Sequence, residues 1–139
     1  MKKLLTILML VLGVAALAAC GGGDDAESES GGAASVLNFD GIDIAFDPTE
    51  ATVKSGETIT VNFDNVGALE HSWVLLAPGV EALEATESDA LAGATSGLVQ
   101  PGDTVTFEFL APPAGDYVIA CTVEGHVEAG MVADLTVEN

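Results

Sequence analysis

The sequence contains few basic side chains, few cysteines and few histidines. Its 139 residues include three Lys and Arg residues in total, two Cys and two His, against 22 Asp and Glu. Nucleic-acid binding depends on cationic side chains that neutralise phosphates, so this charge balance excludes it. The acidity itself has two interpretations that the sequence leaves open. It can provide solubility in a salty environment, or it can steer a basic partner towards the protein.

The N-terminal segment has the three parts of a secretory signal. Lys2 and Lys3 precede a long apolar run, and small residues follow it in LAAC at 17–20. The apolar run is slightly short for a transmembrane helix. LAAC resembles the bacterial lipobox, which implies cleavage before Cys20 and lipid on its thiol; the alternative is an uncleaved N-terminal anchor. We therefore expect residues 1–19 to be a lipoprotein signal peptide and the rest of the chain to be extracytoplasmic.

The segment after the signal differs in composition from the rest of the chain. Residues 20–35 are rich in Gly, Ser and acids, which predicts a flexible, self-repelling tether. Residues 36–139 are long enough for one domain with its own core. Once the signal is removed and Cys20 carries lipid, Lys54 is the only basic side chain and Cys121 the only free thiol. Cys121 must then be buried and inert, joined to another chain, or bound to a ligand.

The domain has the alternation and the turn signals of β-structure. Two segments alternate apolar and polar residues, and three others are continuously apolar, as in strands that are covered on both faces. Residues 79–93 have apolar residues at roughly helical spacing and predict a short helix or compact loop. The expected fold is all-β, a Greek-key β-sandwich or barrel of seven to eight strands. The expected strands lie within 35–39, 42–46, 58–65, 71–76, 104–109, 116–121 and 131–137.

An eleven-residue segment near the C-terminus, CTVEGHVEAGM, concentrates potential metal ligands. It contains Cys121, His126 and Met131 with four residues between each neighbouring pair, and a glycine directly precedes each of the last two. Thiolate, imidazole and thioether form a soft donor set that selects copper, or zinc where a fourth strong ligand exists. The only other histidine is His71. Two His and one Cys with a weak axial Met are the ligands of a type 1 copper site.

These segments resemble the cupredoxins, the plastocyanin and azurin group of blue copper proteins. EHSW at 70–73 resembles the first-histidine segment of that family, and AGDYVIACTVEGH at 114–126 resembles its Gly-acid-Tyr-x-x-x-Cys strand and the Cys-Thr-x-x-Gly-His that follows. The C-x4-H-x4-M spacing is nearest the auracyanin type, and the lipoprotein leader fits membrane-tethered members. The resemblance covers residues 36–139. It implies one type 1 copper per chain, held by His71, Cys121 and His126 with Met131 as the axial ligand.

One position departs from the family pattern. Ser72 follows the first histidine, where the family commonly has an Asn that hydrogen-bonds the cysteine loop. Because a serine side chain is shorter, we expect a weaker or water-bridged contact here. Thr122 is expected to form a hydrogen bond near the site. Tyr117 resembles the tyrosine corner of Greek-key proteins, and Trp73 is expected in the core, with a redox relay as its alternative role.

The resemblance implies a function in electron transfer. A metal whose positions are all filled by protein has no room for a substrate, which argues against an enzyme acting alone. We expect one-electron transfer, with copper cycling between Cu(I) and Cu(II), to redox partners such as a cytochrome or a membrane oxidoreductase complex. The electron is expected to pass through His126, within an apolar patch for which Val127, Ala129 and residues 67–69 are suitable. The protein is expected to be a monomer, lipid-anchored on the outer face of the cell membrane, either periplasmic or at the cell surface.

Each of these residue types, taken alone, more often has an ordinary structural role. A lone buried Cys is usually a small hydrophobe, a Met usually fills a core, and a lone His in a strand usually has a structural hydrogen bond. The combined use of both histidines and the free cysteine favours copper. Two alternative functions stay open: an extracytoplasmic carrier that delivers copper to another protein, and a β-sandwich binding module that holds no metal. A carrier favours exposed clusters of Met and His, and the sequence has none outside this pattern.

Overall fold

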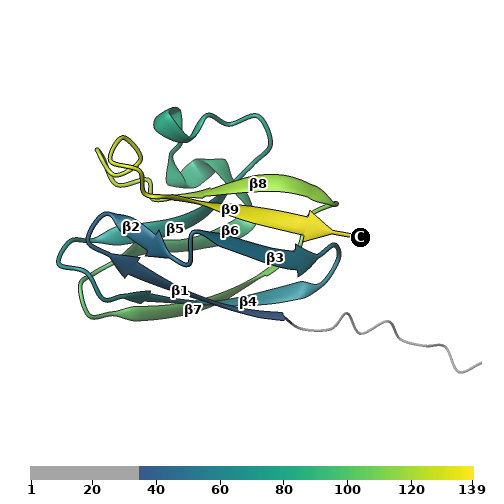
Figure 1. Cartoon of the computed structure of the whole chain (residues 1–139), viewed down its shortest axis with the longest axis horizontal. Coiled ribbons are helices and arrows are strands. Elements are labelled where there is room, and N and C mark those ends of the chain that lie inside the picture. The colour runs from purple at the N-terminus through teal and green to yellow at the C-terminus, as the bar shows by residue number, and fades with distance from the viewer. Residues whose placement is uncertain (1–34) are drawn as a thin grey trace, which may run out of the picture. The chain divides into compact units, whose positions relative to one another are not determined.

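The computed structural model describes residues 35–139, which form two β-sheets that face each other (Figure 1). The predicted signal peptide, the predicted tether and Cys20 therefore lie outside the described residues, apart from Ser35. No helix within the described range has the length and apolar character needed to cross a membrane. The strands are β1 (Ser35–Ile42), β2 (Ala45–Asp47), β3 (Glu50–Lys54), β4 (Thr58–Asn65), β5 (His71–Leu76), β6 (Ala90–Val99), β7 (Thr104–Leu110), β8 (Gly115–Ala120) and β9 (Val132–Glu138).

The order of the strands gives the sandwich a mixed topology. One sheet has the order β2-β1-β4-β7, and the other has the order β3-β9-β8-β5-β6. The pairs β1–β4 and β3–β9 are parallel, and the remaining pairs are antiparallel. The C-terminal pair β8 and β9 lies between β3 and β5, which is the long-range connection expected of a Greek key. The predicted all-β Greek-key sandwich is confirmed.

The alternation in the sequence places the core between the sheets. Along β4, Ile59, Val61 and Phe63 are completely buried, while the residues between them are partly exposed. Trp73 is also completely buried, and its ring packs against Phe39 at a centroid distance of 5.8 Å. Trp73 is therefore a core residue, as expected. Burial of the apolar face of each strand offsets the entropy that is lost when the strands become ordered.

β5 differs from β4 because all six of its residues are buried. Its inner face belongs to the main core, and its outer face is covered by the segment 77–89, which rises above β8 in Figure 1. This segment contains two short 3-10 helices, η1 (Ala82–Glu84) and η2 (Glu87–Asp89). The cover consists of Val80, Ala82 and Ala85, which pack against Val74, Leu76 and Ala120.

The structure has nine strands, and two of them were not expected from the sequence. β3 was missed because its five residues follow directly on a Pro-containing turn. β6 was missed because it carries two glycines and polar residues, and because its pairing with β5 is interrupted by register shifts. Its first residues fall inside 79–93, so the predicted helix or loop ends at residue 89. Ile42 belongs to β1, and the strand expected over 42–46 is reduced to β2.

Tyr117 has the contact expected of a tyrosine corner. Its hydroxyl group donates a hydrogen bond of 2.7 Å to the carbonyl oxygen of Pro113, four residues earlier. This bond fixes the turn that leads into β8. β8 in turn ends at Ala120, directly before Cys121.

Candidate metal centre

The four ligands predicted from the sequence lie at the ends of three strands of the sheet β3-β9-β8-β5-β6 and in one loop. His71 is the first residue of β5, Cys121 follows the last residue of β8, and Met131 precedes the first residue of β9. His126 lies in the loop between β8 and β9, which is found at the left end of the molecule in Figure 1. His71, Cys121 and Met131 are completely buried, and His126 is 6% exposed.

Three of these residues direct donor atoms at one point. The Nδ1 atoms of His71 and His126 are 3.3 Å apart. The Sγ atom of Cys121 lies 3.3 Å from Nδ1 of His126 and 4.0 Å from Nδ1 of His71. Met131 is held beside them through the backbone, because its N–H donates to the carbonyl of His126 and its carbonyl accepts from the N–H of Cys121.

The spacing of these atoms fits one metal ion in a plane of three ligands. With bond lengths like those of zinc, about 2.0 Å to nitrogen and about 2.3 Å to sulfur, a trigonal plane separates its two nitrogens by ~3.5 Å and a nitrogen from the sulfur by ~3.7 Å. The observed separations of 3.3 to 4.0 Å bracket these values. Together with Met131, the arrangement is that of a type 1 copper site.

The loop that carries His126 depends on two glycines. Gly125 has a φ angle of 84° and Gly130 a φ angle of 101°, a region that residues with a side chain rarely adopt. Between them the loop closes on itself, because the N–H of Ala129 donates to the carbonyl of Gly125 at 3.2 Å. The glycines next to the donors thus allow the chain to return His126 and Met131 to the end of the strand that carries Cys121.

Ser72 lies next to the sulfur of Cys121. Its backbone N–H donates to Sγ at 3.4 Å, and its hydroxyl oxygen is 3.9 Å from the same atom. The hydroxyl oxygen also accepts a hydrogen bond of 2.9 Å from the N–H of Thr122 and lies 3.0 Å from the hydroxyl of Thr122. The contact between Ser72 and the cysteine loop is therefore direct, so of the two expected alternatives the water bridge does not apply, and a weaker contact stays a prediction.

The surroundings of His71 lower the pKa of its imidazole, which favours the neutral form. Burial lowers the pKa of His71, and the charge that His126 can carry lowers this pKa further, while Asp43 acts in the opposite direction. A neutral imidazole has a free lone pair, which a metal requires. The environment of His71 therefore favours binding of a metal over binding of a proton.

Three further residues lie around His71; the sequence did not single out Asn65 and Gly41, and it named Gly67 only as part of an apolar patch. Asn65, at the end of β4, is completely buried although it is polar. Gly41 and Gly67 lie against the ring of His71. In the sequence, an Asn at the end of an alternating strand only weakly indicates a role near the metal centre, because its contacts become visible only in the folded structure.

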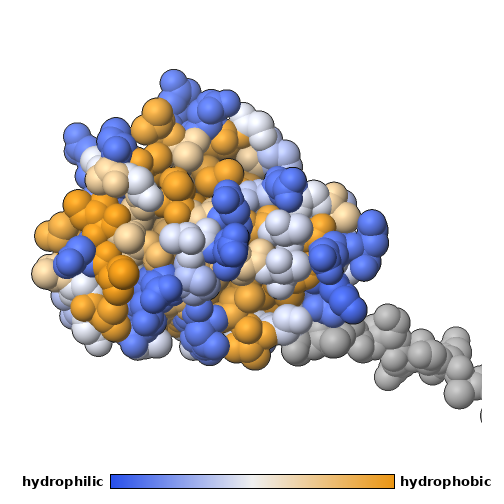
Figure 2. Space-filling view, in the orientation of Figure 1, coloured by the Kyte–Doolittle hydropathy of each residue, from blue (hydrophilic) through white to orange (hydrophobic). Residues whose placement is uncertain are grey.

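The surface beside His71 is partly apolar. Four exposed residues, which we call the apolar rim, lie at the end of β1, in the turn that follows it and in the loop between β4 and β5: Ile42, Ile44, Val66 and Leu69. The two segments are joined, because the N–H groups of Val66 and Gly67 both donate to the carbonyl of Gly41. Orange atoms gather at the corresponding left end of the molecule in Figure 2. Two exposed acids, Asp43 and Glu70, adjoin the rim in the sequence.

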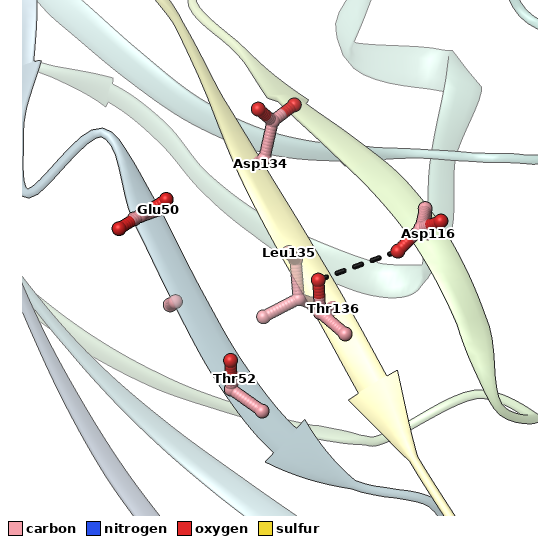
Figure 3. A pocket seen from close by; sticks show the side chains of 7 residues that line it. Glu50, Thr52, Asp116, Asp134, Leu135 and Thr136 are labelled. Atoms are coloured by element: carbon pink, nitrogen blue, oxygen red, sulfur yellow. Dashed lines mark hydrogen bonds between the residues drawn. The ribbon is translucent and has the colours of Figure 1, made fainter.

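A separate hollow lies on the outer face of β3, β9 and β8 (Figure 3). It contains the carboxylates of Glu50, Asp116 and Asp134, and Thr136 donates a hydrogen bond of 3.3 Å to Asp116. Glu50 and Asp134 are paired in register across the two parallel strands. The hollow shares no residue with the metal centre, so we treat it as part of the charged surface.

A two-sheet β-sandwich with two His, one Cys and one Met at one end defines the class of the cupredoxins. A family model described as copper-binding proteins of the plastocyanin/azurin family matches residues 33–138, and the chain belongs to this family. Copper is therefore its cofactor.

Individual relatives point the same way. The chain is 36% identical over 149 residues to Auracyanin-A of Chloroflexus aurantiacus, an alignment that covers 88% of this chain and 92% of the relative. It is 32% identical over 99 residues to the copper-resistant cuproprotein CopI of Rubrivivax gelatinosus, covering 66% of this chain and 59% of CopI. The solved structure of dithionite-reduced auracyanin from Roseiflexus castenholzii matches with a TM-score of 0.65 and 30% identity, over 78% of this chain and all of the other.

Proposed function

We propose that this protein transfers single electrons by means of one type 1 copper. His71, Cys121 and His126 are the three strong ligands and Met131 is the weak axial ligand. The observation that carries the proposal is the convergence of two Nδ1 atoms and one Sγ atom within 4.0 Å of each other. Copper, when bound, supplies a Cu(I)/Cu(II) couple that a thiolate and two imidazoles can hold in both states.

Burial of the donors supports electron transfer rather than catalysis on a bound substrate. Cys121, His71 and Met131 have no exposed surface, and His126 has 6%. Catalytic metal sites keep a position open for water or substrate, and this set of donors fills the positions around the metal. We therefore infer that the protein is not an enzyme by itself.

His126 provides the route for the electron. It is the one proposed ligand with any exposed surface. The apolar rim adjoins His71, whose Nδ1 lies 3.3 Å from that of His126. The rim can exclude water when a partner docks, and close contact over a desolvated surface is what an electron needs to pass between two proteins. The partner is proposed to be another redox protein, such as a cytochrome or a membrane oxidoreductase complex.

The location follows from the leader sequence. We propose that Cys20 carries the lipid and that the chain is anchored as a monomer to the outer face of the cell membrane. The similarity to Auracyanin-A over most of both chains supports an extracytoplasmic protein.

A copper carrier is the second candidate. It is favoured by the similarity to CopI, whose name describes a copper-resistant cuproprotein. A carrier must release its metal, whereas the donors here are buried and the loop around them is closed by hydrogen bonds. A β-sandwich module without a metal is not favoured by any feature of the site.

Voltammetry of the copper-loaded protein separates these functions. We expect one reversible one-electron couple that persists in the presence of a competing copper chelator. Copper that is lost to the chelator within minutes would indicate a carrier. Protein that takes up no copper would rule out both.

A further inference from the structure

Asn65 is a buried polar residue with every side-chain polar atom paired. It is 0% exposed. Its amide nitrogen donates to the carbonyl oxygens of Leu69 at 2.8 Å and Val99 at 2.9 Å. Its amide oxygen accepts a hydrogen bond of 3.1 Å from the N–H of Gly67. A polar side chain is buried at such a position only when its hydrogen bonds are satisfied, so these three contacts fix its orientation.

These contacts hold the loop 66–70, which connects β4 to β5. Two of them go to the loop itself and the third goes to Val99, which is paired with His71 in the register of β5 and β6. The backbone of Asn65 also exchanges two hydrogen bonds with the turn 100–103. Asn65 therefore ties the loop to the strand that lies beside His71.

Gly67 is the point at which this loop meets the imidazole. A methyl group at Gly67 would stand 3.1 Å from Nε2 of His71 and 2.8 Å from the backbone nitrogen of Asp43. A methyl group at Gly41 would stand 3.0 Å from Cδ2 of the same ring. Since the N–H of Gly67 donates to the carbonyl of Gly41 at 2.9 Å, the two glycines are joined. They form a clamp on the ring edge that faces away from Cys121.

The clamp supports an imidazole edge that has no strong hydrogen bond. A metal-bound His usually fixes its ring by donating its second N–H to an acceptor. Within residues 35–139, Nε2 of His71 is buried and makes no hydrogen bond of acceptable geometry. The backbone of Asp43 is within reach of the ring and, together with the charge of that residue, raises the pKa of His71. Contact with the two glycines therefore helps to orient the imidazole beside this weak backbone contact.

We propose that Asn65 is a positioning residue for the metal centre. It holds the loop 66–70 so that Gly67 and Gly41 keep Nδ1 of His71 directed at Cys121 and His126. The proposal rests on the function of His71 as a copper ligand. It implies that the ring is oriented before the metal binds and does not turn when the metal changes its charge.

Asn65→Asp tests this role with little change in size. The variant keeps an oxygen for the N–H of Gly67 but replaces both donated hydrogen bonds by a carboxylate oxygen facing two carbonyls. Asn62→Asp is the matched control, because Asn62 lies in the same strand and its amide makes two exposed bonds of 2.9 Å, one donated to Asn38 and one accepted from Thr106. We expect the visible and electron paramagnetic resonance spectra of the copper protein to shift in Asn65→Asp and to stay unchanged in Asn62→Asp.

Gly67→Ala tests the clamp without a change in charge. It serves as the test of ring positioning if Asn65→Asp does not fold. The backbone of Gly67 lies outside the left-handed region, so the added methyl acts through its contact with His71 and the adjacent turn. We expect a spectral shift here as well. If the folded variants at both positions gave the spectra of the unmodified protein, Asn65 would have a structural role alone and the proposal would be wrong.

The metal-free protein supplies a readout that does not depend on copper. Nuclear magnetic resonance of the His71 ring should show one orientation in the unmodified protein and in Asn62→Asp, and averaged signals in Asn65→Asp. Identical ring signals in all three would overturn the positioning role. Absence of a blue copper spectrum in the unmodified protein would instead overturn the proposed function, so the two failures are distinguishable.

Discussion

His71 and His126 are separated by 55 positions in the chain, yet their Nδ1 atoms lie 3.3 Å apart. Their ring centroids are 5.1 Å apart, and the rings are tilted by 57° to each other. The proximity has a structural cause: His71 begins β5, and the loop of His126 follows β8, which is the neighbour of β5 in the sheet. The pairing of two strands therefore assembles the metal centre, and local sequence alone does not.

Met131 should tune the copper rather than hold it. A thioether is a weak, soft ligand that favours Cu(I) over Cu(II), whereas an amide oxygen is harder. Met131→Gln should therefore lower the reduction potential and leave copper bound at one ion per chain. Voltammetry and copper analysis check the two parts. An unchanged potential would mean that Met131 is not the axial ligand.

The hydroxyl group of Ser72 should matter for both stability and potential. Ser72→Ala removes the acceptor for the N–H of Thr122, a part-buried hydrogen bond whose loss should cost about 1 kcal/mol. It also removes a hydroxyl 3.9 Å from the sulfur of Cys121, and polar contacts to that sulfur tune the potential. We expect lower stability in denaturant and a lower potential. Ser72→Thr keeps the hydroxyl and is the control; equal effects in the two variants would contradict this role.

Tyr117 should stabilise the fold without affecting the copper. Tyr117→Phe removes the hydrogen bond to Pro113 and should lower the free energy of unfolding by about 1 kcal/mol. The visible spectrum should stay the same, because the hydroxyl lies in the turn before β8 and contacts no proposed ligand. A changed spectrum at full copper loading would show that the turn is coupled to the site.

The contribution of the apolar rim to the electron-transfer rate should be separable from that of long-range electrostatic attraction. Leu69 is 47% exposed within the rim, and Leu69→Asp should slow electron transfer to a cationic cytochrome at every salt concentration. The matched control is Leu110→Asp, an exposed leucine whose strand partner Thr58 begins β4, at the far end from Asn65. If Leu69→Asp left the rate at high salt unchanged, the rim would not be the docking surface.

The acids of the hollow in Figure 3 should affect the rate through salt-dependent steering alone. Neutralising them by Glu50→Gln, Asp116→Asn and Asp134→Asn should slow association with a cationic partner at low salt. The effect should disappear as the Debye length falls to about 10 Å near 0.1 M salt. A loss of rate that persisted at high salt would show that this face makes direct contact with the partner.

The sequence predicted the parts of the fold that have strong local patterns. The alternation over 58–65 located β4, and the spacing of Cys121, His126 and Met131 indicated the metal centre without reference to the fold. β6 could not be found in this way, because its glycines and register shifts suppress the alternation of a strand. Asn65 could not be found either, because two of its hydrogen bonds go to backbone carbonyls that only the folded chain brings near.

The central claim is that Cys121 is the thiolate ligand of a type 1 copper. The most direct measurement is the visible spectrum of the copper-loaded protein beside that of Cys121→Ser, with circular dichroism to show that both are folded. Charge transfer from the thiolate to copper should give the unmodified protein a strong absorption in the red, and Cys121→Ser should lack it while remaining a folded β-sandwich. A folded Cys121→Ser protein that kept the blue colour would contradict the account.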